Sequence, residues 1–168
     1  MGSDMNRPAG ILLVDDKVMD IELTLHAFRE KQVKNTVQPL TSGQEALNYL
    51  FGRGPYADRI AHPLPDLILL DLKMPVIDGH EVLRQIKTSP VLKRIPVIVL
   101  TSSGEERDRA LSYDNGVNSY LVKPMSFEGL LEMVQRICDY WLSLNVPPPL
   151  DAGGVEGMTR IKPQQRES

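Results

Sequence analysis

The chain has 168 residues, an apolar share of 42% and a formal net charge of −3. Its length favours one domain, since domains are mostly about 100–150 residues long. The sequence pI near 5.6 argues against a nucleic-acid-binding surface, where a value above about 9 is expected. The single cysteine, Cys138, excludes an internal disulfide framework. No apolar run approaches the ~20 residues of a membrane span, and no secretory signal pattern opens the chain, so we expect the cytoplasm as compartment.

Short apolar runs alternate with longer helical stretches. The expected strands are Gly10–Val14, Thr36–Leu40, Asp66–Leu70, Pro96–Leu100 and Ser119–Val122. The expected helices are Val18–Lys31, Gly43–Phe51, Gly79–Thr88, Glu105–Asn115 and Phe127–Leu144. This alternation predicts a parallel sheet covered by helices on both faces. Thr36–Leu40 lacks the continuous apolar run of a strand buried on both faces, so we predict it at an edge.

Three segments lie outside this alternation. Gly52–Pro65 joins the second expected helix to the third expected strand and is longer than the ~2–6 residues usual for a connection between a helix and a strand. Its length is explained either by a tolerated surface insertion or by a contact with a partner. Residues 146–168 begin near three prolines and are otherwise polar, so we expect a flexible tail with no output domain. We also expect residues 1–9 to be disordered, with Met1–Asp4 an added leader, which leaves one folded domain over residues 10–145.

Polar residues follow directly after four of the expected strands: Asp15 and Asp16, then Asp71, Thr101 and Lys123. Because the carboxyl ends of parallel strands share one edge of a sheet, we expect these side chains to cluster. Three carboxylates in one pocket share protons or bind a cation, and oxygen ligands suit Mg²⁺. A carboxylate beside that ion can attack a phosphoryl group and carry it as an acyl phosphate.

Each of these residues alone also has a structural interpretation. Asp15 or Asp16 could cap the helix that begins near Lys17, because Asp is a favoured N-cap. Thr101 could cap the following helix in the same way, and Lys123 could be an ordinary surface lysine. Their joint placement after four strands favours the chemical interpretation.

Four short motifs surround these residues. They are Leu13-Val14-Asp15-Asp16, Leu69-Leu70-Asp71-Leu72-Lys73-Met74-Pro75 with Asp78-Gly79, Val99-Leu100-Thr101-Ser102, and Tyr120-Leu121-Val122-Lys123-Pro124. Together they resemble the receiver domain of two-component response regulators, over about Gly10 to Leu144. The resemblance implies a flavodoxin-like, doubly wound α/β fold with strand order 2-1-3-4-5. It also implies a bacterial signalling protein that catalyses only its own phosphorylation and dephosphorylation.

By this resemblance Asp71 is the phosphoacceptor and takes its phosphoryl group from a sensor histidine kinase. Mg²⁺ would be bound by the side chains of Asp16 and Asp71 and by the backbone carbonyl of Lys73. Asp15 would act on the ion mainly through water.

The resemblance also assigns the residues that read the phosphoryl group. Thr101 and Lys123 would contact its oxygens, and the ring of Tyr120 would turn inward as Thr101 moves. The Lys123–Pro124 peptide would be cis, an isomer that proline makes accessible.

Two loop positions tune the lifetime of the phosphorylated form in this family, and here they are Lys73 and Ser103. We hypothesise that Lys73 narrows the access of water to the phosphoryl group; the alternative is that both are ordinary loop residues. The histidines His26, His62 and His80 lie on different elements and are expected at the surface, with no metal.

A narrower resemblance concerns partners. The long Gly52–Pro65 loop, the Asp139-Tyr140-Trp141-Leu142 helix end and Pro147–Pro149 resemble stand-alone receivers that partner phytochrome-type histidine kinases. Another single-domain type of receiver is the alternative.

The last helix carries more apolar residues than the single stripe of a core-facing helix. We therefore predict a homodimer or partner surface that includes Ile137, Trp141 and Leu142, the alternative being a slightly apolar terminal helix.

Two other functions compete with a phosphoacceptor. A phosphorylation-independent adaptor would be expected to have lost some of these acids or the lysine. An aspartyl phosphohydrolase needs a second acid two residues after the nucleophile, where Lys73 stands.

Overall fold

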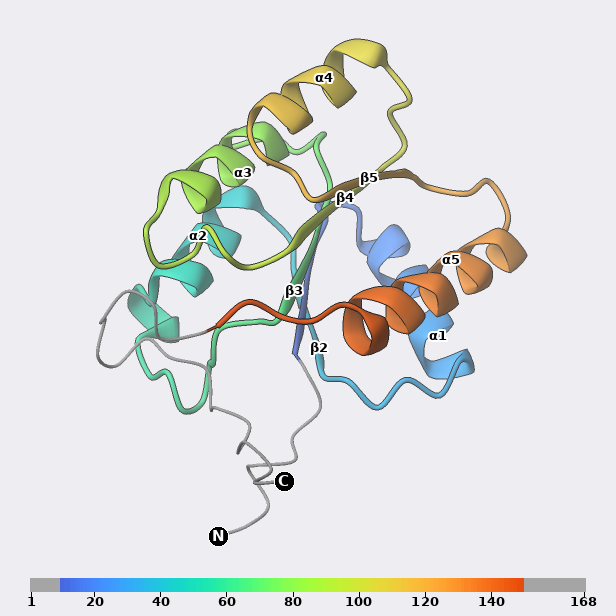
Figure 1. The fold of residues 1–168 in the computed structure, drawn as a ribbon, viewed down its shortest axis with the longest axis horizontal. Helices are drawn as coiled ribbons and strands as arrows, with labels where there is room; N and C mark the ends of the chain where they lie inside the picture. The colour runs from blue at the N-terminus through green and yellow to red at the C-terminus, as the bar shows by residue number, and fades with distance from the viewer. Residues whose placement is uncertain (1–9, 150–168) are drawn as a thin grey trace, which may run out of the picture.

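The computed structural model describes residues 10–149, which form a parallel sheet between two layers of helices (Figure 1). The strands are β1 (Ile11–Val14), β2 (Val37–Leu40), β3 (Leu67–Leu70), β4 (Val97–Thr101) and β5 (Ser119–Val122). Their order is β2-β1-β3-β4-β5 and all neighbours are parallel. The predicted doubly wound fold, the strand order and the edge position of the second strand are confirmed.

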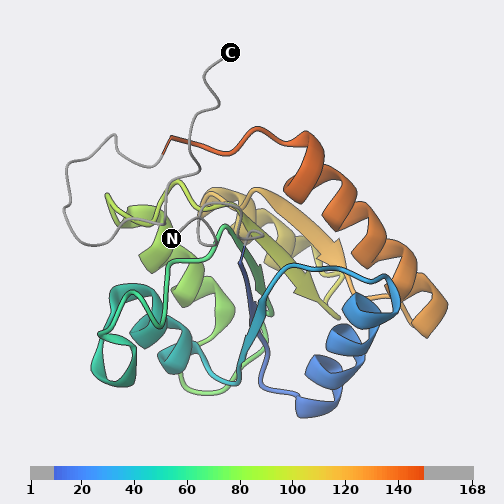
Figure 2. The ribbon, with the colours of Figure 1, turned by 90° about the horizontal axis from the view of Figure 1, so that it is seen from below.

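Helices cover both faces of the sheet. They are α1 (Val18–Glu30), α2 (Gly43–Phe51), α3 (Gly79–Thr88), α4 (Glu106–Asp114) and α5 (Phe127–Asp139), with the short 3₁₀ helix η2 (Gly54–Tyr56) and the π-helical turn η3 (Tyr140–Leu144). Figure 2 shows α1 and α5 side by side on one face, with α2 and α3 on the other. The expected last helix therefore ends as an α-helix at Asp139 and continues to Leu144 as the π-helical turn.

The core is divided by the sheet. Successive residues of a strand point to opposite faces, so Ile11 and Leu13 pack with α1 and α5, whereas Leu12 and Val14 pack with α2 and α3. All four residues of β3 are fully buried. The central strand that carries Asp71 at its end is thus held from both sides.

The long segment after α2, Gly52–Pro65, is joined to that helix by side-chain hydrogen bonds. The Arg59 guanidinium donates to the carbonyls of Tyr49 and Leu50 at 2.7 and 2.6 Å, which satisfies acceptors that a helix end leaves open. Tyr56 donates its hydroxyl to Glu45 at 2.8 Å. A partner contact of this segment stays a prediction.

The expected disorder of residues 1–9 and of most of the tail, residues 150–168, lies outside the described residues. Within the described part of the chain, none of the helices combines the length and the apolar character needed to cross a bilayer.

Candidate functional site

The carboxyl ends of β1, β3 and β4 bring three buried polar side chains to one edge of the sheet. The register pairs Val14 with Leu70, so the next residues, Asp15 and Asp71, leave the sheet together. The Asp71 amide donates to the Val14 carbonyl at 2.9 Å, which extends the ladder one residue beyond the strand. Asp15, Asp71 and Thr101 are at most 3% exposed.

Three carboxylates meet at this edge. Asp15, Asp16 and Asp71 each offer an oxygen, and these oxygens lie within 4.8 Å of one another. Asp16 Oδ1 and Asp71 Oδ2 are buried and accept no hydrogen bond. Buried carboxylate oxygens without a hydrogen-bond partner are costly, and a hard divalent cation is the partner that such a set of oxygens fits.

Neither Asp15 nor Asp16 caps α1, because the N-cap is Lys17 and no side chain makes a capping hydrogen bond there. Asp15 Oδ1 accepts from the Lys17 amide at 2.9 Å, at the entrance to α1. Its other oxygen, Oδ2, accepts from Lys123 Nζ at 2.6 Å. Asp15 therefore orders the start of α1 and faces the cluster at the same time.

Lys123 reaches the cluster from the end of β5. Its ammonium group donates to Asp15 at 2.6 Å and to Asp20 at 2.8 Å, and it lies 3.8 Å from Asp71 Oδ2. The side chain is 15% exposed, so it is not the ordinary surface lysine that a lone residue would suggest. Asp20, in the first turn of α1, was not predicted as part of the site.

The two central charges shift each other's pKa. Burial raises the pKa of Asp71, and the opposing effects of Lys123 and of the neighbouring Thr101 hydroxyl do not offset it. Burial by itself would lower the pKa of Lys123, but the hydrogen bonds to Asp15 and Asp20 and the charge of Asp71 raise it. The lysine is therefore held charged against the carboxylates.

Tyr120 and Lys123 lie on β5, next to the loop that follows Thr101. The Tyr120 hydroxyl donates to the Ser103 carbonyl at 2.7 Å, and the Lys123 amide donates to the Thr101 carbonyl at 2.7 Å. The expected cis peptide between Lys123 and Pro124 is wrong, because residues 10–149 contain no cis peptide bond. The trans form is the intrinsically preferred isomer even before proline, and Lys123 reaches the carboxylates with it.

The loop after Asp71 is held by a close backbone contact at Gly79, the first residue of α3. A Cβ atom there would lie 2.7 Å from Leu72 Cα and closer still to the Asp71 carbonyl oxygen. Asp78 caps the helix by accepting from the Glu81 amide at 3.0 Å. Asp78-Gly79 is therefore the start of a helix packed on the loop that follows Asp71.

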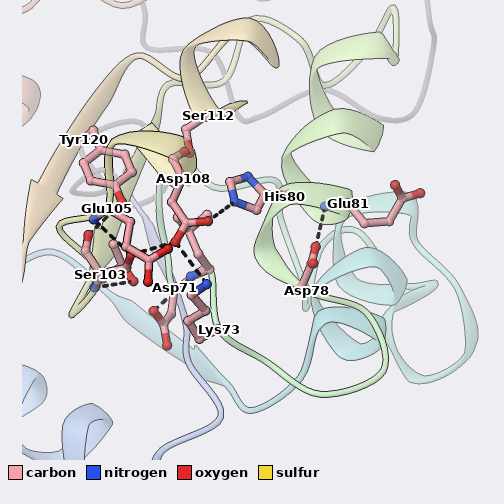
Figure 3. Close-up of polar contacts among 12 residues, drawn as sticks. Asp71, Lys73, Asp78, His80, Glu81, Ser103, Glu105, Asp108, Ser112 and Tyr120 are labelled. Carbon is pink, nitrogen blue, oxygen red and sulfur yellow. Dashed lines mark hydrogen bonds and ion pairs between the residues drawn. The ribbon is translucent and has the colours of Figure 1, made fainter. Parts of the chain in front are cut away.

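A second polar cluster adjoins the site and centres on Asp108, in the first turn of α4 (Figure 3). One carboxylate oxygen accepts from Ser103 Oγ at 2.6 Å and lies 3.0 Å from Lys73 Nζ. The other lies 3.1 Å from His80 Nε2. The Ser103 hydrogen bond, helped by His80 and Lys73, holds the pKa of Asp108 far below its usual value although burial opposes this.

The sequence did not reveal this second cluster. His80 was expected at the surface, which is wrong, because its side chain is only 14% exposed and pairs with Asp108. Asp108 sits in the hydrophilic run Glu105–Arg109 and looks solvated. The available signal was that α4 has almost no apolar stripe, so its inward positions, Asp108 and Ser112, had to be polar.

The residues predicted for a dimer or partner surface lie around the end of α5. Trp141 and Leu142 are partly buried against the α1 and α5 core. Ile137 is 3% exposed, so its side chain supports this region from beneath. An open cavity of about 410 Å³ lies here, lined by Leu121 of β5, by Ile137 and by Trp141 among others.

Comparisons with known proteins agree with this geometry. Residues 11–135 match the model of the response regulator receiver domain. The probable methanogenesis regulatory protein FilR2 of Methanothrix harundinacea is 43% identical over 141 residues, which are 84% of this chain and 88% of FilR2. The response regulator Rcp1 of Synechocystis sp. is 42% identical over 142 residues, 84% of this chain and 95% of Rcp1.

Solved structures give the same result. The phosphorylated cyanobacterial phytochrome response regulator RcpA superposes with a TM-score of 0.79 at 42% identity, covering 84% of this chain and 99% of RcpA. The Mn²⁺-bound form of Rcp1 has a TM-score of 0.76 at 41% identity, covering 84% of this chain and all of that one. The chain therefore belongs to the response regulator receiver domain family.

Proposed function

We propose that this receiver accepts a phosphoryl group on Asp71 from a sensor histidine kinase, in a Mg²⁺-dependent reaction, and signals by a change in conformation or dimerisation. The observation that carries the proposal is the carboxylate cluster, in which buried oxygens of Asp16 and Asp71 lack hydrogen-bond partners beside the ammonium group of Lys123. Such a cluster suits a metal-assisted phosphoryl acceptor better than a structural cap.

In the proposed reaction an Asp71 carboxylate oxygen attacks the phosphorus of a phosphohistidine in line. The new O–P bond forms as the N–P bond breaks, and the leaving imidazole of the kinase takes a proton from solvent. Asp71 Oδ1 accepts from the Leu72 amide at 2.9 Å, which fixes the carboxylate plane. Lys123, 3.8 Å from Asp71 Oδ2, neutralises charge on the transferred oxygens.

Asp15, Asp16 and Asp71 would hold the divalent ion, together with the Lys73 carbonyl, and the bound ion would neutralise charge on the phosphoryl oxygens. The distances among the carboxylates and the Mn²⁺-bound form of the related Rcp1 support this assignment.

The signal would leave through Thr101 and Tyr120. A phosphoryl group that draws the Thr101 hydroxyl toward Asp71 also pulls on Ser103, whose carbonyl accepts from Tyr120. Phosphorylation would then shift an equilibrium between two arrangements of the β4–α4 loop and β5.

The proposed partners are a kinase of the phytochrome type and a second copy of the chain. The likeness to RcpA, a phytochrome response regulator, supports the kinase type. The edge position of β5 and the cavity between it and α5 support an isologous dimer at this face.

Phosphorylation is tested with Mg²⁺ and a small-molecule phosphodonor, followed by intact mass measurement. The wild-type protein should gain one phosphoryl group, and Asp71→Asn should gain none. A wild-type protein that gains none would favour a phosphorylation-independent adaptor.

Dimerisation is tested by light scattering of the wild-type protein and of Trp141→Ser at micromolar concentration. The wild type should show twice the 18.8 kDa monomer mass, and the variant should be shifted toward monomer. A wild-type monomer with and without phosphorylation would overturn the dimer.

A further inference from the structure

Asp108 contacts one side chain from each of the two loops that flank Asp71. Lys73 lies two residues after Asp71, and Ser103 lies two residues after Thr101. Both converge on one oxygen of Asp108, at 3.0 and 2.6 Å (Figure 3). One carboxylate of α4 therefore ties the β3–α3 loop to the β4–α4 loop.

The Lys73 side chain is free to leave Asp108 for another partner. Its side chain is 55% exposed and has a flexible four-carbon stem with a rotatable ammonium group. Its only ion pair among the described residues is with Asp108.

The Asp108 carboxylate would keep its other partners if Lys73 moved away. Ser103 Oγ still donates to it, and His80 Nε2 still faces its other oxygen. His80 Nδ1 is buried without a hydrogen-bond partner, which favours the tautomer with its proton on Nε2, donated to Asp108. Losing the lysine therefore does not leave this buried carboxylate unpaired.

We propose that Asp108 is a positioning residue that holds Lys73 in the unphosphorylated protein and loses it to the phosphoryl group on Asp71. The inference rests on the proposed function, because it requires a phosphoryl group there. A phosphoryl group carries more negative charge than a carboxylate and offers three acceptor oxygens, so it competes for a lysine two residues away. Transfer of Lys73 cuts the charged link from the β3–α3 loop to α4.

The consequence is a coupling between phosphorylation and α4. While Lys73 is bound, its ion pair stabilises the position of α4 that suits Ser103 and the Tyr120 contact with its carbonyl. Once it is released, α4 is held to the site by Ser103 and His80 alone. Asp108 thereby opposes phosphorylation, and its removal should favour the phosphorylated arrangement.

The test is a double-mutant cycle with Asp108→Asn and Lys73→Gln, using beryllofluoride with Mg²⁺ as the phosphoryl probe. Asparagine keeps the shape of Asp108 and can still hydrogen-bond Ser103 and His80. We expect Asp108→Asn to raise the affinity for the probe about two- to fivefold, the range of a partly exposed ion pair. In the Lys73→Gln background the same substitution should change the affinity less than about 1.5-fold, because no lysine remains to be released.

An equal effect of Asp108→Asn in both backgrounds, or no effect in either, would overturn the proposal. A crystal structure of the wild-type protein with Mg²⁺ and beryllofluoride gives a second measurement that needs no variant. Lys73 Nζ should then contact the probe and lie more than 4 Å from Asp108, and an intact ion pair would overturn the proposal. If the wild type binds no beryllofluoride, or Asp71→Asn binds it equally well, the proposed function fails as well.

Discussion

Replacing Gly79 with alanine tests whether close backbone contact positions Asp71. The added Cβ would lie 2.7 Å from Leu72 Cα, whereas ordinary contacts begin at 3.4 Å. The start of α3 must therefore retreat by at least about 0.7 Å, and by more at the Asp71 carbonyl oxygen. Both obstacles are backbone atoms, so no side chain can rotate away to make room.

The size of the effect follows from this overlap. Overpacking of this kind costs about 1–3 kcal/mol, offset by up to ~1 kcal/mol because alanine favours a helix over glycine. The net loss of about 0–3 kcal/mol leaves the domain folded, since single domains have about 5–15 kcal/mol of stability. The phosphorylation rate should fall more steeply, because a misplacement of about 1 Å can cost 10²-fold.

Urea unfolding measures the stability, and mass spectrometry against time with Mg²⁺ and a phosphodonor measures the rate. Gly10→Ala is the matched control, because nothing lies within 4 Å of its added Cβ. It should change the free energy of unfolding by less than about 0.5 kcal/mol and leave the rate unchanged. A Gly79→Ala protein as stable and as quickly phosphorylated as this control would refute the reasoning.

Three further substitutions test the surroundings. Lys123→Met leaves buried carboxylates without their cation and should cost about 3–5 kcal/mol of unfolding free energy in metal-free urea at pH 7.5. Because burial raises the pKa of Asp71 and lets it take a proton, the cost should be smaller at pH 5, and equal costs at the two pH values would contradict the prediction. Burial, with a smaller contribution from the hydrogen bond to Glu45, raises the pKa of Tyr56 from 10.0 to about 12. The tyrosine therefore stabilises the folded protein fully below pH 10 and loses this contribution as the pH rises toward 12. The difference in free energy of unfolding between wild type and Tyr56→Phe should shrink from pH 10 to pH 12, and a constant difference would contradict the prediction. Ser126→Ala removes the N-cap of α5, where the serine hydroxyl accepts from the Gly129 amide at 3.0 Å. The free energy of unfolding should fall by about 1 kcal/mol, and an unchanged melting temperature would show that the cap is unimportant.

The first cluster could be predicted from the sequence because one rule of geometry assembles it. Parallel strands end at a common edge, so residues that directly follow buried strands meet there whatever their separation along the chain. To place Asp71 and Lys123 at this edge, only the ends of the strands had to be predicted correctly, and the apolar runs before the two residues indicate those ends. Asp20 was missed because its contact with Lys123 depends on how the first turn of α1 lies on the sheet.

The second cluster could not be predicted in this way. Asp108 meets His80 only because α3 and α4 pack side by side, and no periodic pattern specifies which residues of two polar helix faces touch. The resemblance to receivers singled out Lys73 and Ser103, and an effect of these loop positions on the lifetime of the phosphorylated form stays a prediction. The sequence could not reveal that one carboxylate holds both.

The two lysines near Asp71 are suited to different tasks by their burial. Lys123 is 15% exposed and is bound by two carboxylates, and breaking such a buried group of charges is costly. It therefore fixes the geometry in which the proposed phosphoryl group would be received. Lys73 is 55% exposed and its pairing with Asp108 is worth at most about 1 kcal/mol, which a phosphoryl group can overcome. A rigid cation for the chemistry and an exchangeable cation for the response are what the proposed phosphorylation switch at this edge of the sheet requires.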